Sequence, residues 1–242
     1  MEKQVYTIKE NRLVATDTYK LVLSGPGNVD GEFVQIEIPG FYLRRPISVC
    51  DTTEEGLTLI YKTVGEGTKK LATFPEGTQV NVLTGLGRGF DADACRSDAL
   101  LVAGGLGVAP LYLLAKRLKA QGKRVTAVLG FNTEADVVML QEYRALCDSI
   151  SLVTMDGSAG IKGFVTDAIQ AIRPRYDYYY TCGPMVMMQA VCEMLEGLGE
   201  ASLEERMGCG AGFCYGCSIH TANGPARVCK DGPVFKKEDI LW

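Results

Sequence analysis

The sequence has little of what marks several large classes of protein. No uninterrupted apolar run approaches the roughly 20 residues that a membrane-spanning helix needs, and the start, MEKQVYTIKENRLV, lacks the apolar core of a signal peptide. With 25 Lys and Arg against 29 Asp and Glu, the net charge of -4 offers no basic excess for a nucleic-acid backbone. We therefore expect a cytoplasmic protein with no membrane or nucleic-acid partner. The single histidine, His220, is expected at the surface and nearly excludes histidine-based acid–base catalysis.

Cysteine, by contrast, is plentiful and unevenly placed. Four of the 9 cysteines fall close together in the glycine-rich stretch RMGCGAGFCYGCSIHTANGPARVCKDGPV. In a reducing compartment such thiols are metal ligands, buried small side chains or reactive groups more often than disulfides. Four residues separate Cys209 from Cys214, two separate Cys214 from Cys217, and eleven separate Cys217 from Cys229. The first three follow the plant-type iron–sulfur spacing. A two-iron, two-sulfur (2Fe-2S) cluster is therefore favoured over two alternatives, a structural zinc site and no metal at all. Structural zinc sites usually show two short-spaced pairs of cysteines.

The rhythm of the sequence changes twice along the chain. Up to about Asp98, short β-rich runs alternate with Gly, Pro and Asp-Thr turns, which indicates a small antiparallel barrel interrupted by one helix that begins near Gly67. From Ala99, apolar strands alternate with helical segments, the pattern of an open parallel sheet with helices on its faces. The helical segments predicted there are 109–122, 136–146 and 185–199.

This organisation predicts three parts. Residues 1–98 are expected to form an all-β barrel, residues 99–203 an α/β parallel-sheet domain, and residues 204–242 a small C-terminal iron–sulfur segment, while the binding motifs within the first two assign FAD to the barrel and NAD to the sheet. The last part begins where the periodicity is lost, after about Ser202.

Two stretches of the first part fit a flavin diphosphate. RRPIS, at 44–48, is predicted to precede a strand, and VGEGTKKL, at 64–71, follows another. The second stretch places glycines and Thr68 at a helix start, where free amides and the helix dipole favour a phosphate. Arg45 could clamp the same diphosphate. Each stretch alone is more often an ordinary turn, and the alternative for Ile47 and Tyr61 is that they are core residues.

The second part opens with the strand and glycine turn LLVAGGLGVAPL. Its spacing does not fit the G-x-G-x-x-G fingerprint, but Gly104, Gly105 and Gly107 would let a dinucleotide approach a helix start. Further along, TCGPMVMM puts a second group at the carboxyl end of a strand, the edge at which open parallel sheets bind ligands. That group is Cys182, Gly183 and Pro184. Cys182 taken alone is more readily a buried small side chain.

The choice between NAD and NADP depends on the segment after the second strand. An NADP site commonly has an arginine near the ribose 2′-phosphate. The stretch GFNTEADVV offers Glu134 and Asp136 and no basic residue. The sequence therefore predicts a preference for NADH.

Taken in order, these motifs resemble a known family over nearly the whole chain. RPIS, YK before VGEGTKKL, AGGLGVAPL, DGSAGIKGFVTDAI, CGPMVMM and MGCGAGFCYGC followed by VCKDGPVF resemble the ferredoxin–NADP reductase superfamily. Within it they resemble the electron-transfer subunits of class 1B dihydroorotate dehydrogenases, and the cysteine cassette with CKDGPVF is the most specific part. The resemblance implies a 2Fe-2S cluster on Cys209, Cys214, Cys217 and Cys229. It also implies an FAD held by Arg45, Pro46, Ile47, Ser48, Ile60, Tyr61, Lys62, Gly67 and Thr68.

The chain differs from that family or its relatives in three details, at Ile47, in the gap before Cys229 and at Cys209. The superfamily often has a flavin-stacking tyrosine where Ile47 stands, and the eleven-residue gap before Cys229 is short. A related subunit, that of the bifurcating NADH-dependent ferredoxin–NADP reductases, has an aspartate among its cluster ligands where this chain has Cys209. That difference favours the dihydroorotate branch.

The resemblance implies an electron relay with no catalytic side chain of its own. Dihydroorotate would be oxidised on a separate FMN-containing subunit, in a heterotetramer with two of each chain, as a step of de novo pyrimidine biosynthesis. Electrons would cross the cluster singly to the FAD, and a hydride would pass to NAD+. The alternatives are a stand-alone NAD(P)H-dependent reductase of another acceptor and, less favoured, a zinc-stapled binding module without redox activity.

Overall fold

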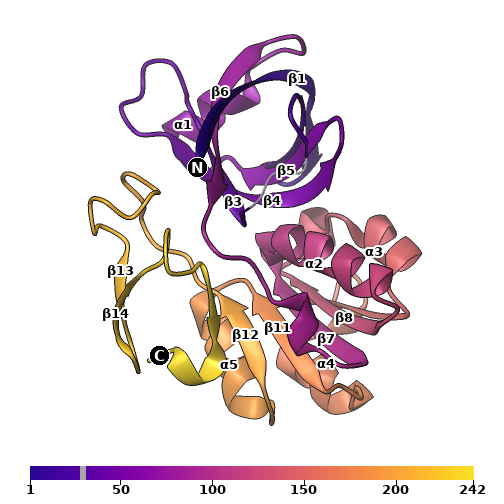
Figure 1. Ribbon diagram of the computed structural model, residues 1–242. Helices are drawn as coiled ribbons and strands as arrows, with labels where there is room; N and C mark the ends of the chain where they lie inside the picture. The colour runs from indigo at the N-terminus through magenta and orange to yellow at the C-terminus, as the bar shows by residue number, and fades with distance from the viewer. Residues whose placement is uncertain (28–30) are drawn as a thin grey trace. The chain divides into compact units, whose positions relative to one another are not determined.

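Six antiparallel strands close into a β-barrel at the N-terminal end of the chain (Figure 1). The computed structural model describes residues 1–27 and 31–242. The strands follow one another around the barrel in the order β1-β2-β5-β4-β3-β6. Their bounds are β1 (Glu2–Ala15), β2 (Thr18–Ser24), β3 (Phe33–Ile36), β4 (Arg45–Thr53), β5 (Gly56–Lys62) and β6 (Gln79–Leu86). The predicted barrel is confirmed, and so is its helix, α1 (Glu66–Ala72).

The sequence predicted that the stretch RRPIS precedes a strand. This prediction is wrong, because β4 itself begins at Arg45. Gln35 of β3 pairs with Pro46, and Phe33 pairs with Ser48. A proline is tolerated near the start of a strand, where its missing N–H removes little of the ladder. The motif is therefore part of the barrel wall.

The second half of the chain forms a seven-stranded sheet in the order β10-β9-β8-β7-β11-β12-β15, parallel except for β15. Its strands are β7 (Asp98–Gly104), β8 (Arg124–Phe131), β9 (Ser149–Thr154), β10 (Ile161–Lys162), β11 (Tyr178–Cys182), β12 (Gly199–Ser202) and β15 (Val234–Lys236). Helices α2 (Val108–Ala120) and α3 (Leu140–Leu146) pack together over one face. Helices α4 (Val165–Ile172) and α5 (Met185–Met194) pack together over the other face (Figure 1). The predicted parallel sheet is confirmed.

Two predicted helices are shorter than their apolar patterns suggested. Between 136 and 146 the chain forms only the end of a 3₁₀ turn, η3 (Glu134–Asp136), and then α3, because Met139 has a left-handed φ of 62°. In the 185–199 segment the helix ends at Met194, and a turn with Gly197 at φ 82° leads into β12. Helix propensity is overridden there because Gly199 pairs beside Tyr179 in the sheet.

The cysteine-rich tail contains strands that its composition did not predict. Strands β13 (Ser218–Thr221) and β14 (Gly224–Arg227) form a hairpin with His220 exposed on it, and β15 adds antiparallel to β12. The remaining short turns are η1 (Ala92–Ala94), η2 (Gly105–Gly107) and η4 (Lys237–Asp239).

The chain forms two compact units. Residues 1–89 and 204–233 make up the first, and residues 90–203 and 234–242 the second. Most of the tail therefore packs with the barrel, and its last strand packs with the sheet. The division into three parts at residues 98 and 203 stays a prediction.

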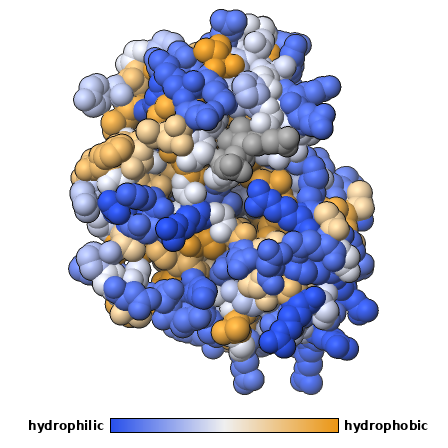
Figure 2. Space-filling view, viewed as in Figure 1, coloured by the Kyte–Doolittle hydropathy of each residue, from blue (hydrophilic) through white to orange (hydrophobic). Residues whose placement is uncertain are grey.

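The surface mixes polar and apolar residues, as the visible face shows (Figure 2). Across the described residues, no helix is both long enough and apolar enough to cross a membrane.

Candidate cofactor-binding sites

The four cysteines of the tail, called here the cluster cysteines (Cys209, Cys214, Cys217 and Cys229), come together as two neighbouring pairs. The backbone N–H of Cys214 lies 3.4 Å from Cys209 Sγ, and that of Cys229 lies 3.4 Å from Cys217 Sγ. Cys217 and Cys229 are buried, whereas Cys214 is exposed. Within 1–27 and 31–242, no group of three or more His, Cys, Asp or Glu side chains is arranged to hold one metal ion.

Backbone N–H groups of this loop point at the sulfur atoms. Cys209 Sγ accepts from the N–H groups of Ala211, Phe213 and Cys214 at 3.5, 3.2 and 3.4 Å. Burial opposes ionisation of this thiol, but the three donors outweigh it and lower the pKa of Cys209 to about 6. Burial and the neighbouring Cys217 thiol raise the pKa of Cys229 to about 12. The loop thus favours a thiolate at Cys209, the form that binds iron.

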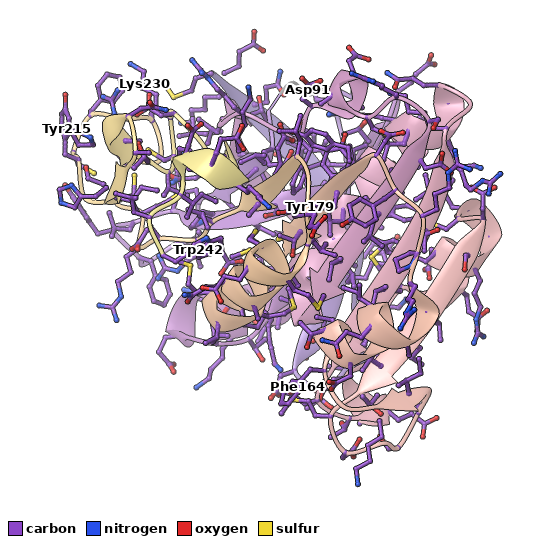
Figure 3. All side chains as sticks on the ribbon, turned by 90° about the horizontal axis from the view of Figure 1, so that it is seen from below. Asp91, Phe164, Tyr179, Tyr215, Lys230 and Trp242 are labelled. Carbon is purple, nitrogen blue, oxygen red and sulfur yellow. The ribbon has the colours of Figure 1, made fainter. Side chains whose placement is uncertain are left out.

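Arg227 braces the loop from the β13–β14 hairpin. Its guanidinium donates to the Gly212 carbonyl at 3.0 Å, pairs with Asp231 at 3.1 Å and lies 5.0 Å from the centre of the Tyr215 ring. Tyr215 and Lys230 lie at the same end of the tail (Figure 3). Lys230 packs so closely on Gly212, which has φ 85°, that a Cβ there would come within 2.5 Å of it. The sequence did not reveal this brace.

A second unpredicted contact joins the loop to the barrel. A Cβ added to Gly210 would lie 1.9 Å from Nε2 of Gln35, which projects from β3. Gln35 is 1% exposed. The sequence signal that could have indicated this contact is that Gln35 is the one polar residue in the otherwise apolar run FVQI.

The predicted phosphate-binding residues of the barrel converge. Arg45, at the start of β4, lies across Gly67 in the first turn of α1, so that a Cβ on Gly67 would stand 2.2 Å from its Nε. The guanidinium also lies 4.8 Å from the centre of the Phe41 ring. The hydroxyl of Thr68 donates to the Gly65 carbonyl at 3.0 Å, so this side chain caps the helix. The bare Cα of Gly67 in the first turn of α1 and the guanidinium of Arg45 beside it fit a diphosphate.

The RPIS residues divide between the two faces of the barrel wall. Ile47 pairs with Val34, and both are buried. Pro46 and Ser48 pair with Gln35 and Phe33 of β3 and so share their face. Because Gln35 contacts the cysteine-rich loop, the predicted flavin residues Pro46 and Ser48 lie on the same face of the barrel as that loop.

The other predicted flavin residues end strand β5. Ile60 and Tyr61 are buried at 5% and 3% exposure, and Lys62 is half-buried. The Tyr61 ring stacks on Tyr19, and its hydroxyl donates to Asn11 Oδ1 at 2.9 Å. Burial raises the pKa of Tyr61. The Tyr61 side chain therefore packs in the barrel, as its alternative interpretation held, and the flavin roles of these three residues stay predictions.

The predicted nucleotide residues meet at the carboxyl edge of the parallel sheet. From β7 the chain proceeds through β8 and β9 to β10 on one side, whereas β11 lies on the other side of β7. The strand order therefore reverses between β7 and β11. Open parallel sheets bind ligands outside the strand ends at such a point.

Backbone contact is tight where these two strands end. A Cβ on Gly107 would come within 2.0 Å of the Cys182 carbonyl oxygen. Gly183, at φ 151°, would bring a Cβ to 2.9 Å from the Gly104 backbone. Close packing thus requires glycines at these positions, and Gly105 adds a left-handed φ of 53°. A residue with a side chain would fill the approach to the start of α2.

Of the two acidic residues predicted after β8, one is bound within its own turn and the other is exposed to solvent. Asp136 accepts from the Thr133 N–H and hydroxyl at 3.2 and 3.1 Å and is occupied locally. Glu134 is exposed, and its own N–H donates to Ser158 Oγ at 2.7 Å. Glu134 is therefore the better candidate to meet a nucleotide ribose.

Family comparisons match both halves of this arrangement. Residues 101–193 match the oxidoreductase NAD-binding domain, and residues 204–241 match the iron–sulfur cluster binding domain of dihydroorotate dehydrogenase B. The fold and these sites define an NAD-linked oxidoreductase with an iron–sulfur segment.

Full-length relatives identify the family. The chain is 42% identical over 251 residues to the dihydroorotate dehydrogenase B (NAD(+)) electron transfer subunit of Shouchella clausii, covering 97% of this chain and 96% of the relative. It is also 42% identical over 258 residues to the same subunit of Bacillus cereus, covering 100% and 99%. The chain belongs to the family of dihydroorotate dehydrogenase B electron transfer subunits.

Solved structures agree with this fold. The chain superposes on an NADH-dependent reduced ferredoxin–NADP oxidoreductase with a TM-score of 0.89 and 31% identity, over 98% of this chain and 90% of that one. Phthalate dioxygenase reductase shares the fold, with a TM-score of 0.65 and 22% identity over 78% of this chain and 63% of that one.

Proposed function

We propose that this chain transfers electrons between NAD+ and the catalytic subunit of a cytoplasmic dihydroorotate dehydrogenase, as a step of pyrimidine biosynthesis. The partner contains FMN and oxidises dihydroorotate, and the complex holds two of each chain. This chain supplies no catalytic side chain of its own, because its residues bind and orient the groups that carry electrons.

One observation carries the proposal: the cysteine-rich loop packs on the face of the barrel wall that presents Pro46 and Ser48. A loop that favours a thiolate at Cys209 and a motif that fits a flavin thus share a single surface of one compact unit. When bound, the FAD exchanges a hydride with the nicotinamide and single electrons with the cluster.

Each group has its own set of residues. The cluster cysteines would hold the 2Fe-2S cluster, with Cys209 and Cys214 as one close pair and Cys217 and Cys229 as the other. Arg45 and the first turn of α1 neutralise and orient the FAD diphosphate. At the edge of the sheet, Gly104, Gly107 and Gly183 leave room for the nicotinamide nucleotide.

The partner's approach is suggested by the exposed rim of the loop. Phe213 and Tyr215 are 75% and 65% exposed on either side of Cys214, the one exposed cluster cysteine. Large exposed aromatic side chains are typical anchors of protein interfaces. The partner therefore docks over this rim, next to the cluster.

Reconstitution tests the proposal. The chain alone, loaded with FAD and cluster, is expected to oxidise NADH with artificial acceptors and to form no NADH from dihydroorotate. Adding the FMN-containing catalytic subunit of the same organism should yield dihydroorotate-dependent NADH formation. Formation of NADH by this chain alone, or no complex with that subunit, would instead support a stand-alone reductase.

A further inference from the structure

The side-chain Nε2 of Gln35 is a buried donor without a hydrogen-bond partner in the described part of the chain, residues 1–27 and 31–242. The side chain is 1% exposed. Buried amide N–H groups nearly always have an acceptor, because an unmatched donor away from water is costly. An acceptor for this amide is therefore expected close by.

The amide faces the cysteine-rich loop. Its Nε2 lies against Gly210, the residue between Cys209 and Ala211, at a distance that leaves no room for a Cβ. Gly210 is buried and has φ 64°, so the loop turns sharply where the amide approaches. The donor is thus aimed into the loop that carries the first cluster ligand.

The loop already supplies the same chemistry from its backbone. N–H groups of Gly212 and Gly216 donate to Cys229 Sγ and Cys214 Sγ at 3.2 and 3.5 Å, besides the three donors to Cys209. An amide from β3 would add a side-chain donor to this set.

We infer that the Gln35 amide donates an N–H hydrogen bond to a sulfur atom of the cluster, either the Cys209 thiolate or a sulfide beside Gly210. This rests on the proposed cluster. The bond makes Gln35 a positioning residue that sets the reduction potential, because an N–H donor stabilises the more negative, reduced form more than the oxidised form. Gln35 pairs with Pro46 in the barrel wall, so it also links the loop to the strand that carries the flavin motif.

A direct measurement needs no substitution at first. In the cluster-loaded chain labelled with ¹⁵N only in glutamine side-chain amides and reduced with dithionite, pulsed electron paramagnetic resonance should detect a ¹⁵N nucleus coupled to the cluster spin. Gln35→Met keeps the length of the side chain but removes the donor, and should abolish that coupling. A cluster signal without ¹⁵N coupling in the unsubstituted protein overturns the inference, whatever the variant does.

The reduction potential provides the second readout. Gln35→Met is expected to shift the one-electron reduction equilibrium about tenfold toward the oxidised cluster, which lowers the potential by about 59 mV. Gln79→Met, the same change at an exposed position of the same barrel, should leave it unchanged. Equal potentials in both variants and the unsubstituted chain would overturn the inference. Absence of any cluster in the unsubstituted protein would instead overturn the proposed function.

Discussion

Replacing Arg45 should weaken FAD binding while leaving the barrel folded. The guanidinium lies across the bare Cα of Gly67 at the start of α1, where a diphosphate would receive a charge-assisted bond. Hydrogen bonds to charged groups contribute roughly 1.5–3 kcal/mol, and about 1.4 kcal/mol is a factor of ten in affinity. Because Arg45 is half-buried and partly screened by water, the lower half of that range applies. Arg45→Ala should therefore raise the FAD dissociation constant roughly tenfold to fiftyfold.

Gly67→Ala tests the same contact from the other side. Its Cβ would overlap Arg45 Nε, so the guanidinium must move away, yet alanine favours a helix more than glycine does. This variant should bind FAD more weakly without losing thermal stability.

Arg44→Ala is the matched control. Arg44 precedes Arg45 in the sequence, but its guanidinium pairs with Glu37 and donates to the Asn81 carbonyl at 3.0 Å. The assay is titration of deflavinated protein with FAD, followed by flavin fluorescence. Unchanged affinity in both Arg45→Ala and Gly67→Ala, or an equal loss in Arg44→Ala, would refute the placement of the diphosphate.

Three other outcomes are expected. Serine in place of any one cluster cysteine should impair cluster assembly, whereas Cys50→Ser, at a buried barrel position, should not. A normal reduced-cluster electron paramagnetic resonance signal in all four variants of the cluster cysteines would contradict this prediction. The chain should use NADH with a higher kcat/KM than NADPH, because Glu134 follows β8 without a basic neighbour in the sequence. Glu134→Arg should narrow the difference in kcat/KM between the two nucleotides. Equal kcat/KM for NADH and NADPH in the unsubstituted chain would contradict the predicted preference for NADH. Burial raises the pKa of Glu200 from 4.5 to about 7, so its protonated form is favoured by folding and its stabilising effect is lost as pH rises through that window. Between pH 4.5 and 8 the free energy of unfolding should therefore fall by up to about 3 kcal/mol, and Glu200→Gln should remove that fall. Identical pH dependence of the two proteins in urea unfolding would contradict this.

The features predicted well from the sequence are those with a strong local signal. Regular turns and β-rich runs indicated the barrel, and apolar strands alternating with helices indicated the parallel sheet. Gly104 and Gly183 were placed correctly where strands end, and Gly107 in the turn before α2, because glycine punctuates such turns.

Features that depend on distant partners were not predicted. The strand β15 forms only because β12 offers an edge, and nothing in the tail's composition indicates it. The left-handed φ of Met139 delays the start of the helix predicted from residue 136, and apolar periodicity does not reveal it. Gln35 reads as an ordinary strand residue until the fold brings Gly210 against it. Tertiary contacts between segments far apart in the sequence decide the first and the last of these features.

Electron transfer through this chain is tested most directly in the reconstituted complex under anaerobic conditions without NAD+. Mixing with dihydroorotate should produce the reduced-cluster electron paramagnetic resonance signal within the turnover time. A complex built with the Cys229→Ser chain should lose both that signal and dihydroorotate-dependent NADH formation. NADH formation at the unsubstituted rate by a complex whose chain carries no cluster would contradict the relay.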